Sequence, residues 1–203
     1  MQKNATCRWL GVIAMLGLAF FFITSLVLQF ARTDLDWYTT AISFYLLGRY
    51  SGWLVAAYFG LGAAILAVGL GAYLALGTAA RRLPTVLFAV GAIAVCVVAL
   101  AHTDTHESGH TVVGAIHLLA AATAFLCVTI AMLLQSWSFK HDPRWKAHFL
   151  RAFVLAVVTF VALWLYALWH ALPTGATQKT VILLIVLWLM LVSRWLTRLP
   201  PET

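Results

Sequence analysis

The residues best suited to chemistry lie close together, in the stretch HTDTHESGHTVVGAIH from His102 to His117. Four histidines, an aspartate and a glutamate occur there in a chain that is otherwise largely apolar. From His106 to His110 the sequence reads H-E-x-x-H. On a helix these two histidines would share a face and could bind zinc, leaving Glu107 to polarise a bound water as general base. The predicted metal ligands are His102, His106, His110 and His117.

Three interpretations of this segment stay open. In the first, it binds zinc or another divalent transition metal without catalysis. In the second, the protein is a metal-dependent hydrolase that acts at the outer leaflet with Glu107 as its base. In the third, the polar residues only cap helix ends, and the protein is a non-enzymatic structural or accessory subunit of a membrane complex. Haem held between His117 and His170 is a further, less favoured candidate cofactor, because nothing in the sequence favours haem over zinc.

The composition is typical of a membrane protein. Of the 203 residues 64% are hydrophobic and only 9% are charged, whereas soluble domains carry roughly 25% charged residues. The net charge of +7 comes from basic residues that fall between apolar runs rather than in one stripe. We therefore expect a lipid bilayer as the surroundings and no nucleic-acid partner.

Apolar runs of about 17 to 25 residues are expected to cross a bilayer as helices. Six such runs predict an all-α, single-domain membrane bundle over residues 1–203. The aromatic segment 38–50 is interrupted by Arg49 and reads as an interfacial segment or as a long start to the second helix. The predicted spans are 9–30, 53–77, 84–101, 112–134, 153–169 and 181–195.

Lysine and arginine predict the orientation of these spans. With six crossings, ten basic residues fall on the side of the termini and three (Arg32, Arg49 and Lys179) on the other. The positive-inside rule then predicts a multi-pass protein of the cell inner (plasma) membrane with both termini in the cytoplasm. The histidine-rich segment would face outwards.

The second helix, with the segment that leads into it, carries small residues at every fourth position, at Gly48, Gly52, Ala56, Gly60 and Ala64. Small residues at this spacing allow helix backbones to approach closely. Packing within the bundle is the favoured interpretation, and the same surface is the candidate for contact with another membrane protein.

Several stretches occur in an order that resembles a prokaryotic family of multi-pass membrane proteins, the domain of unknown function 998. They are AISFYLLGRYSGWLVAAYFGLGAAIL, HTDTHESGHTVVGAIHLLAAATAFL, HDPRWKAHF and TGATQKTVILLIVLW. The resemblance covers about Asp34 to Leu196 and implies a multi-helix membrane fold without a reaction. His106 and Glu107 are not part of the family pattern. The positions that align with it are Ser43, Gly48, Gly52, Trp53, Asp104, Gly114, His117 and Gln178.

His117 falls about one turn inside the fourth span, where an ionisable group usually needs a partner. The connections that follow the first, third and fifth spans lie on the same side as this histidine, and short spans keep their ends close. We therefore predict a polar pocket at the outer face. Besides the histidines, its predicted members are Asp34, Asp36, Ser43, Arg49, Asp104, His170 and Gln178.

Overall fold

The computed structural model describes residues 3–76, 82–105, 109–169 and 171–200. Within these residues the chain is all-helical, and six α-helices are long and apolar enough to cross a membrane. The predicted all-α membrane bundle is thereby confirmed. The helices are α1 (Lys3–Ala31), α2 (Ser51–Ala75), α3 (Arg82–Leu100), α4 (Val112–Phe139), α5 (Phe149–Leu168) and α6 (Thr174–Thr197), and two short 3-10 helices are η1 (Ile42–Leu46) and η3 (Lys146–His148).

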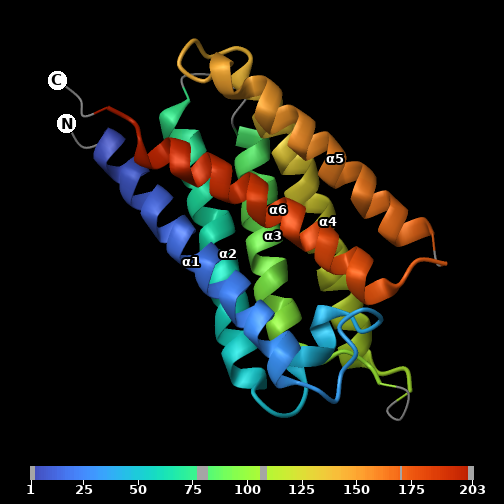
Figure 1. The fold of residues 1–203 in the computed structure, drawn as a ribbon. Coiled ribbons are helices and arrows are strands. Elements are labelled where there is room, and N and C mark those ends of the chain that lie inside the picture. The colour runs from blue at the N-terminus through green and yellow to red at the C-terminus, as the bar shows by residue number, and fades with distance from the viewer. Residues whose placement is uncertain (1–2, 77–81, 106–108, 170, 201–203) are drawn as a thin grey trace.

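The six helices follow one another around the bundle, and α6 closes it by packing between α5 and α1 (Figure 1). The contact between α1 and α2 is the most extensive, whereas those of α5 with α4 and α6 are the least extensive between neighbours. Helix α5 also buries the smallest share of its membrane-spanning length. The bundle is therefore packed most loosely on the two sides of α5.

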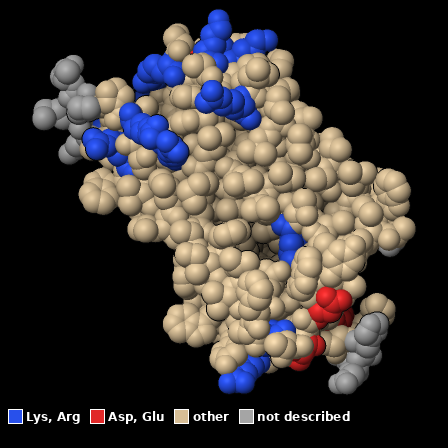
Figure 2. Space-filling view, viewed as in Figure 1, with Lys and Arg blue, Asp and Glu red and all other residues tan. Residues whose placement is uncertain are grey.

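Both termini lie at the same end of the bundle, which we call the terminal end. There the side-chain amide of Asn4 donates to the Pro200 carbonyl at 3.0 Å. The opposite, distal end carries the connections that follow α1, α3 and α5. Blue lysine and arginine side chains crowd the terminal end, whereas the acidic side chains visible in this view lie at the distal end (Figure 2).

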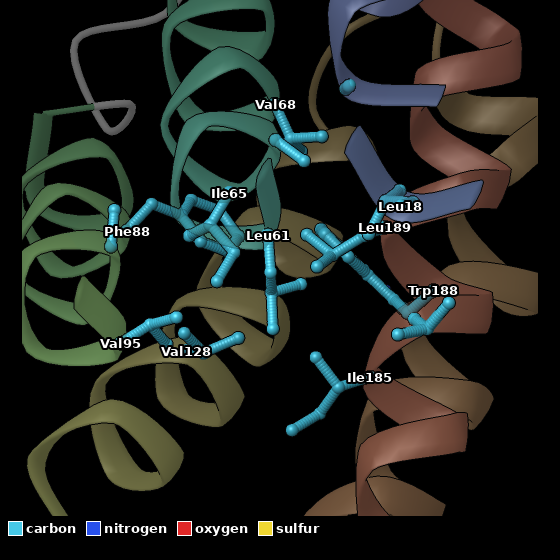
Figure 3. Close-up of a cluster of buried hydrophobic side chains, with 14 of the residues drawn as sticks. Leu18, Leu61, Ile65, Val68, Phe88, Val95, Val128, Ile185, Trp188 and Leu189 are labelled. Carbon is cyan, nitrogen blue, oxygen red and sulfur yellow. The ribbon is translucent and has the colours of Figure 1, made fainter. Parts of the chain in front are cut away.

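The core is a continuous apolar cluster to which α1, α2, α3, α4 and α6 all contribute (Figure 3). Trp188 is fully buried in it, and its indole N–H donates to the Ser136 hydroxyl at 3.1 Å and to the Ala152 carbonyl at 3.0 Å. Apolar side chains gain little from leaving lipid, so close packing and such buried hydrogen bonds hold the helices together.

Two glycines of α2 allow neighbouring helices to pack closely against it. A Cβ at Gly62 would lie 2.8 Å from the Cys96 sulfur of α3, and one at Gly71 would lie 2.6 Å from Leu196 of α6. Gly48 is not part of the helix. It precedes α2, has a φ of +74° and lies against the Arg32 guanidinium.

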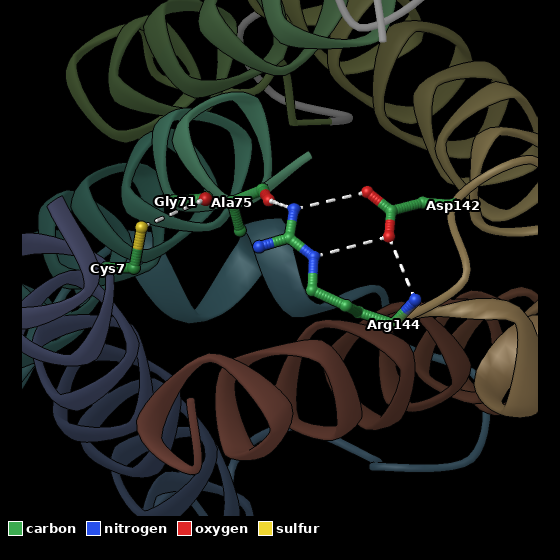
Figure 4. A network of polar contacts seen from close by, with 5 residues as sticks. All are labelled: Cys7, Gly71, Ala75, Asp142 and Arg144. Atoms are coloured by element: carbon green, nitrogen blue, oxygen red, sulfur yellow. Dashed lines mark hydrogen bonds and ion pairs between the residues drawn. The ribbon is translucent and has the colours of Figure 1, made fainter. Parts of the chain in front are cut away.

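A small polar network ties the terminal end together (Figure 4). Arg144 donates to the carbonyl of Ala75, the last residue of α2, at 2.6 Å and pairs with Asp142 at 3.3 Å. The final carbonyls of a helix have no partner within the helix, so the arginine satisfies one of them. This contact connects the α4–α5 connection to the end of α2.

Predicted and observed helices differ mainly at their ends. The fourth helix begins at Val112 as predicted and continues to Phe139 instead of residue 134. The sixth begins at Thr174, seven residues before the predicted span 181–195. Segment 38–50 contains η1 and ends before α2, as the interfacial interpretation expects.

Candidate ligand-binding cavity

The connection between α1 and α2, residues 32–50, is fastened at the distal end by a buried arginine. The Arg32 guanidinium forms two hydrogen bonds with the Asp34 carboxylate, at 2.8 and 2.7 Å. It also donates to the carbonyls of Leu47 at 2.6 Å and Arg49 at 3.2 Å. Hydrogen bonding from Arg32 lowers the pKa of Asp34 from its ordinary value. One side chain therefore joins the two ends of the connection, which suits the planar, five-donor group of arginine.

The same connection docks on the first turn of α6. The backbone N–H groups of Gly175 and Ala176 donate to the carbonyls of Thr39 at 3.1 Å and Tyr38 at 2.8 Å. These amides belong to a helix N-terminus, where they lack partners within the helix. A Cβ at residue 175 would lie 2.6 Å from the Thr40 carbonyl oxygen, so this contact requires glycine.

Gln178, one turn further along α6, joins three segments. Its side-chain oxygen accepts from the Ile42 backbone N–H at 2.9 Å, and its side-chain N–H donates to the Tyr166 hydroxyl of α5 at 3.3 Å. Ile42 is followed by Ser43, whose side chain is buried. The glutamine thus fixes one polar wall of the distal half of the bundle.

The connection between α3 and α4 is organised by Asp104 and Thr111. Thr111 caps α4 by accepting from the Gly114 N–H at 3.0 Å, and it donates its hydroxyl to Asp104 at 2.6 Å. A Cβ at Gly114 would overlap the Asp104 carboxylate. The Thr111 hydroxyl, followed by the Thr111 backbone N–H, lowers the pKa of the Asp104 carboxyl. Asp104 therefore supports the N-terminal cap of α4 through its hydrogen bond with Thr111.

His117 projects from the second turn of α4 and is only 5% exposed. Its Nδ1 lies 2.7 Å from the Ala101 carbonyl oxygen. A carbonyl oxygen can only accept, so Nδ1 carries the proton. In the neutral ring Nε2 is then an acceptor that is left for another partner.

His117 lines two adjoining spaces. An inner cavity of about 70 Å³ lies between the helices of the distal half, and a lateral groove of about 420 Å³ lies between α4 and α5. A water-sized group needs only roughly 10–15 Å³ of such volume, so both spaces exceed one water. The residues that line both are Ser43, His117, Ala121, Phe125 and Gln178.

The lining of both spaces is apolar apart from a few neutral groups. Leu61 and Ile65 of α2 face the inner cavity, and Leu163 and Trp164 of α5 face the groove. None of the described residues that line either space is lysine, arginine, aspartate or glutamate. A few hydrogen-bonding groups in an apolar lining are typical of sites for small molecules.

The structure brings together only part of the predicted pocket. Ser43, His117 and Gln178 line the inner cavity together. Asp36 does not join them, because it accepts hydrogen bonds from the Tyr38 N–H and the Thr39 hydroxyl, both at 2.9 Å, within the α1–α2 connection. The Tyr38 N–H is the main cause of the lowered pKa of Asp36. Arg49 is exposed, with its guanidinium 4.6 Å from the centre of the Tyr50 ring. Asp34 and Asp104 are engaged with Arg32 and Thr111, as described above.

The predicted metal set is not assembled by the residues whose positions are described. His106, Glu107 and His170 lie outside those residues, while His102 and His110 are exposed. Among the described histidines, cysteines and acids, no group of three or more could hold a metal ion. The zinc, hydrolase and haem hypotheses stay predictions.

Two residues central to this geometry were missed by the sequence reasoning. Tyr166 was not among the predicted pocket residues, although its hydroxyl contacts Gln178 and its side chain lines the groove. Arg32 was counted only for its charge. Its position directly after an apolar span, two residues before Asp34, is the one signal that could have indicated a buried pair.

Comparison with known families gives a match over most of the chain. Residues 15–195 match the model of a family described as protein of unknown function (DUF998). Searches of curated proteins and of solved structures found no match.

Proposed function

The chain belongs to the DUF998 family, a family without an assigned activity, and from the geometry of its cavity we propose that it binds a neutral amphiphile taken laterally from the bilayer. The hydroxyl-bearing head of the amphiphile occupies the polar wall of the cavity, and its apolar tail lies in the groove between α4 and α5. The observation that carries this proposal is that Ser43, His117 and Gln178 line both the inner cavity and the lateral groove.

The chemistry of the lining supports a neutral head group. An ion would lose its hydration on entering a space without a described charged partner, at a cost of several kcal/mol. His117 offers Nε2 as an acceptor because its Nδ1 is engaged by the Ala101 carbonyl. A hydroxyl can donate to this nitrogen and accept from Ser43.

The packing of α5 supports lateral access. The groove opens along one of the two least extensive contacts between neighbouring helices. On α4 it is lined by Ala121 and Ala122, whose small side chains leave room beside Trp164. A tail in this groove would stay in contact with lipid, so binding needs no transfer of the tail into water.

Photolabelling tests the proposal directly. A long-chain alcohol with a diazirine next to its hydroxyl head should label Leu61 and Ile65, because both face the inner cavity and are buried from surrounding lipid. The corresponding methyl ether cannot donate to His117 and should label about tenfold less, the loss expected for one hydrogen bond. Labelled positions are read by mass spectrometry of peptides.

A matched pair of variants separates the cavity from the surrounding lipid. Ala121→Trp fills the space that joins groove and cavity and should remove the label from Leu61 and Ile65. Leu119→Trp lies on the same helix, but it is 71% exposed and outside both spaces, so labelling should persist. Adducts confined to lipid-facing residues in the wild type would refute the proposal.

We further propose that the distal end faces outwards from the cell inner (plasma) membrane. Of the described basic residues, three lie at that end (Arg32, Arg49 and Lys179) and the others at the terminal end. We expect a reporter that works only outside the cytoplasm to be active after Thr105 and inactive after Lys140. The reverse pattern would overturn the orientation but would leave the binding proposal intact.

A further inference from the structure

A second groove, of about 260 Å³, lies between α1 and α6, on the side of α6 away from α4 and α5. Most of the residues that line it are apolar, including Phe22 and Leu26 of α1 and Leu183 of α6. Unlike the spaces described above, it is lined by a cation, Lys179.

Lys179 is the charged group of this groove. Its ammonium group donates to the carbonyl of Trp37 and, at 3.0 Å, to that of Thr40. Within the described chain it has no acidic side chain at ion-pair distance, and the nearby Asp36 carboxylate is engaged by Tyr38 and Thr39. The two carbonyls orient the ammonium without neutralising it, so its charge is available to an anion.

The neighbouring polar groups come from the last two turns of α1. Ser25 is 9% exposed, and its hydroxyl has no hydrogen-bond partner among the described residues. Gln29 is one turn closer to the distal end and donates its side-chain N–H to the Ser25 carbonyl at 3.1 Å. A buried hydroxyl without a partner is costly in an apolar setting, and here it faces the groove.

We propose that this groove holds one anionic phospholipid of the distal leaflet, with its phosphate at Lys179 and one acyl chain between α1 and α6. The apolar stretch from Phe21 to Gln29 covers about 12 Å of helix, which is most of one leaflet of a hydrocarbon core about 30 Å thick. A single fixed cation at the head-group end of an apolar groove matches the charge distribution of such a lipid. A layer of shared side chains lies between this groove and the inner cavity. The residues that line both spaces are Phe21, Ile42, Ile182 and Val186.

Native mass spectrometry of the detergent-purified full chain tests this site. With added phosphatidylglycerol, we expect one molecule to be retained, with at least about tenfold preference over diacylglycerol, which lacks the phosphate. Lys179→Gln should lower retention by about the same factor, and Lys179→Arg should preserve most of it because the charge remains.

Lys179 also holds the α1–α2 connection through the carbonyls of Trp37 and Thr40, so its replacement can disturb that connection. A second pair of variants, which leaves Lys179 in place, tests the groove separately. Leu183→Trp fills the groove and should abolish the retained lipid, whereas Leu187→Trp, one turn further along α6 and outside the groove, should not. Equal retention of diacylglycerol would remove the role of the phosphate. If the two tryptophan variants retained the same amount of phosphatidylglycerol, the retained molecule would belong to the ordinary surrounding lipid and not to this groove. Either result overturns this inference without touching the alcohol-labelling result for the inner cavity.

Discussion

Replacing Gly17 with alanine is expected to separate α1 from α2 locally and to lower the free energy of unfolding by about 1–3 kcal/mol. A Cβ at this position would overlap the carbonyl oxygen of Gly60 and lie 3.2 Å from the Cβ of Ala64. The obstacle is backbone, which cannot rotate away as a side chain can. Because α1 and α2 share the most extensive helix contact of the bundle, a shift there should spread along both helices.

The matched control is Gly52→Ala. Alanine gains helix propensity at both positions, by about 1 kcal/mol at Gly17 inside α1 and by less at Gly52 in the first turn of α2. Around Gly52, however, no atom lies within 4 Å of an added Cβ. Thermal unfolding of the two purified variants should therefore move in opposite directions from the wild type. Similar midpoints for both would show that the approach at Gly17 is not important for stability.

This pair also indicates how far the pattern of small residues could be interpreted from the sequence. The four-residue spacing identified Gly60 and Ala64, which do meet α1. It could not separate them from Gly52 and Ala56, which are exposed, or from Gly48, which precedes the helix. Spacing identifies one face of a helix, but the partner that covers each part of that face depends on tertiary packing. A contact of the exposed part with another membrane protein stays a prediction.

The helix boundaries could be predicted where a local signal exists. Val112 was predicted as the first residue of a helix, and Thr111 caps that helix through its side chain. The start of α6 was missed because its first turns contain Thr174, Gly175 and Gln178, which do not extend the apolar run. These turns are held by carbonyls of the distant segment around Tyr38, and nothing in their own sequence specifies that contact.

The candidate site likewise contains residues that were correctly predicted from the sequence and residues that were not. His117 was identified as a polar group near the end of a span and Gln178 through the resemblance to the family, and both line the cavity. The acids were predicted to join them on the same reasoning, but short polar groups near helix ends are equally suited to turns and caps. Asp36 and Asp104 accept hydrogen bonds from residues close in sequence, which is the simpler use of a carboxylate there.

Replacing Arg32 with methionine is expected to release the connection over residues 32–50 and to lower the free energy of unfolding by about 2–3 kcal/mol. The side chain is 8% exposed, and its loss leaves the carbonyls of Leu47 and Arg49 without their donor. Most of the effect should come from these partly buried carbonyls, because the side chain of Asp34 is 61% exposed and such pairs contribute little. Arg49→Met, at an exposed arginine of the same connection, should change stability far less.

The pH dependence of the stability difference between wild type and Arg32→Met provides a second measurement. Arg32 lowers the pKa of Asp34 in the folded protein, so the contribution of the pair is complete above the ordinary aspartate range near 3.9. It is lost as the pH falls through the lowered folded pKa, because the protonated carboxyl no longer pairs. The lowered pKa values of Asp36 and Asp104 have causes other than Arg32 and should largely cancel between wild type and variant. The stability gap between wild type and Arg32→Met should therefore narrow slightly in acid, and a gap that widens as the pH falls would contradict the assignment of Asp34 as the partner of Arg32.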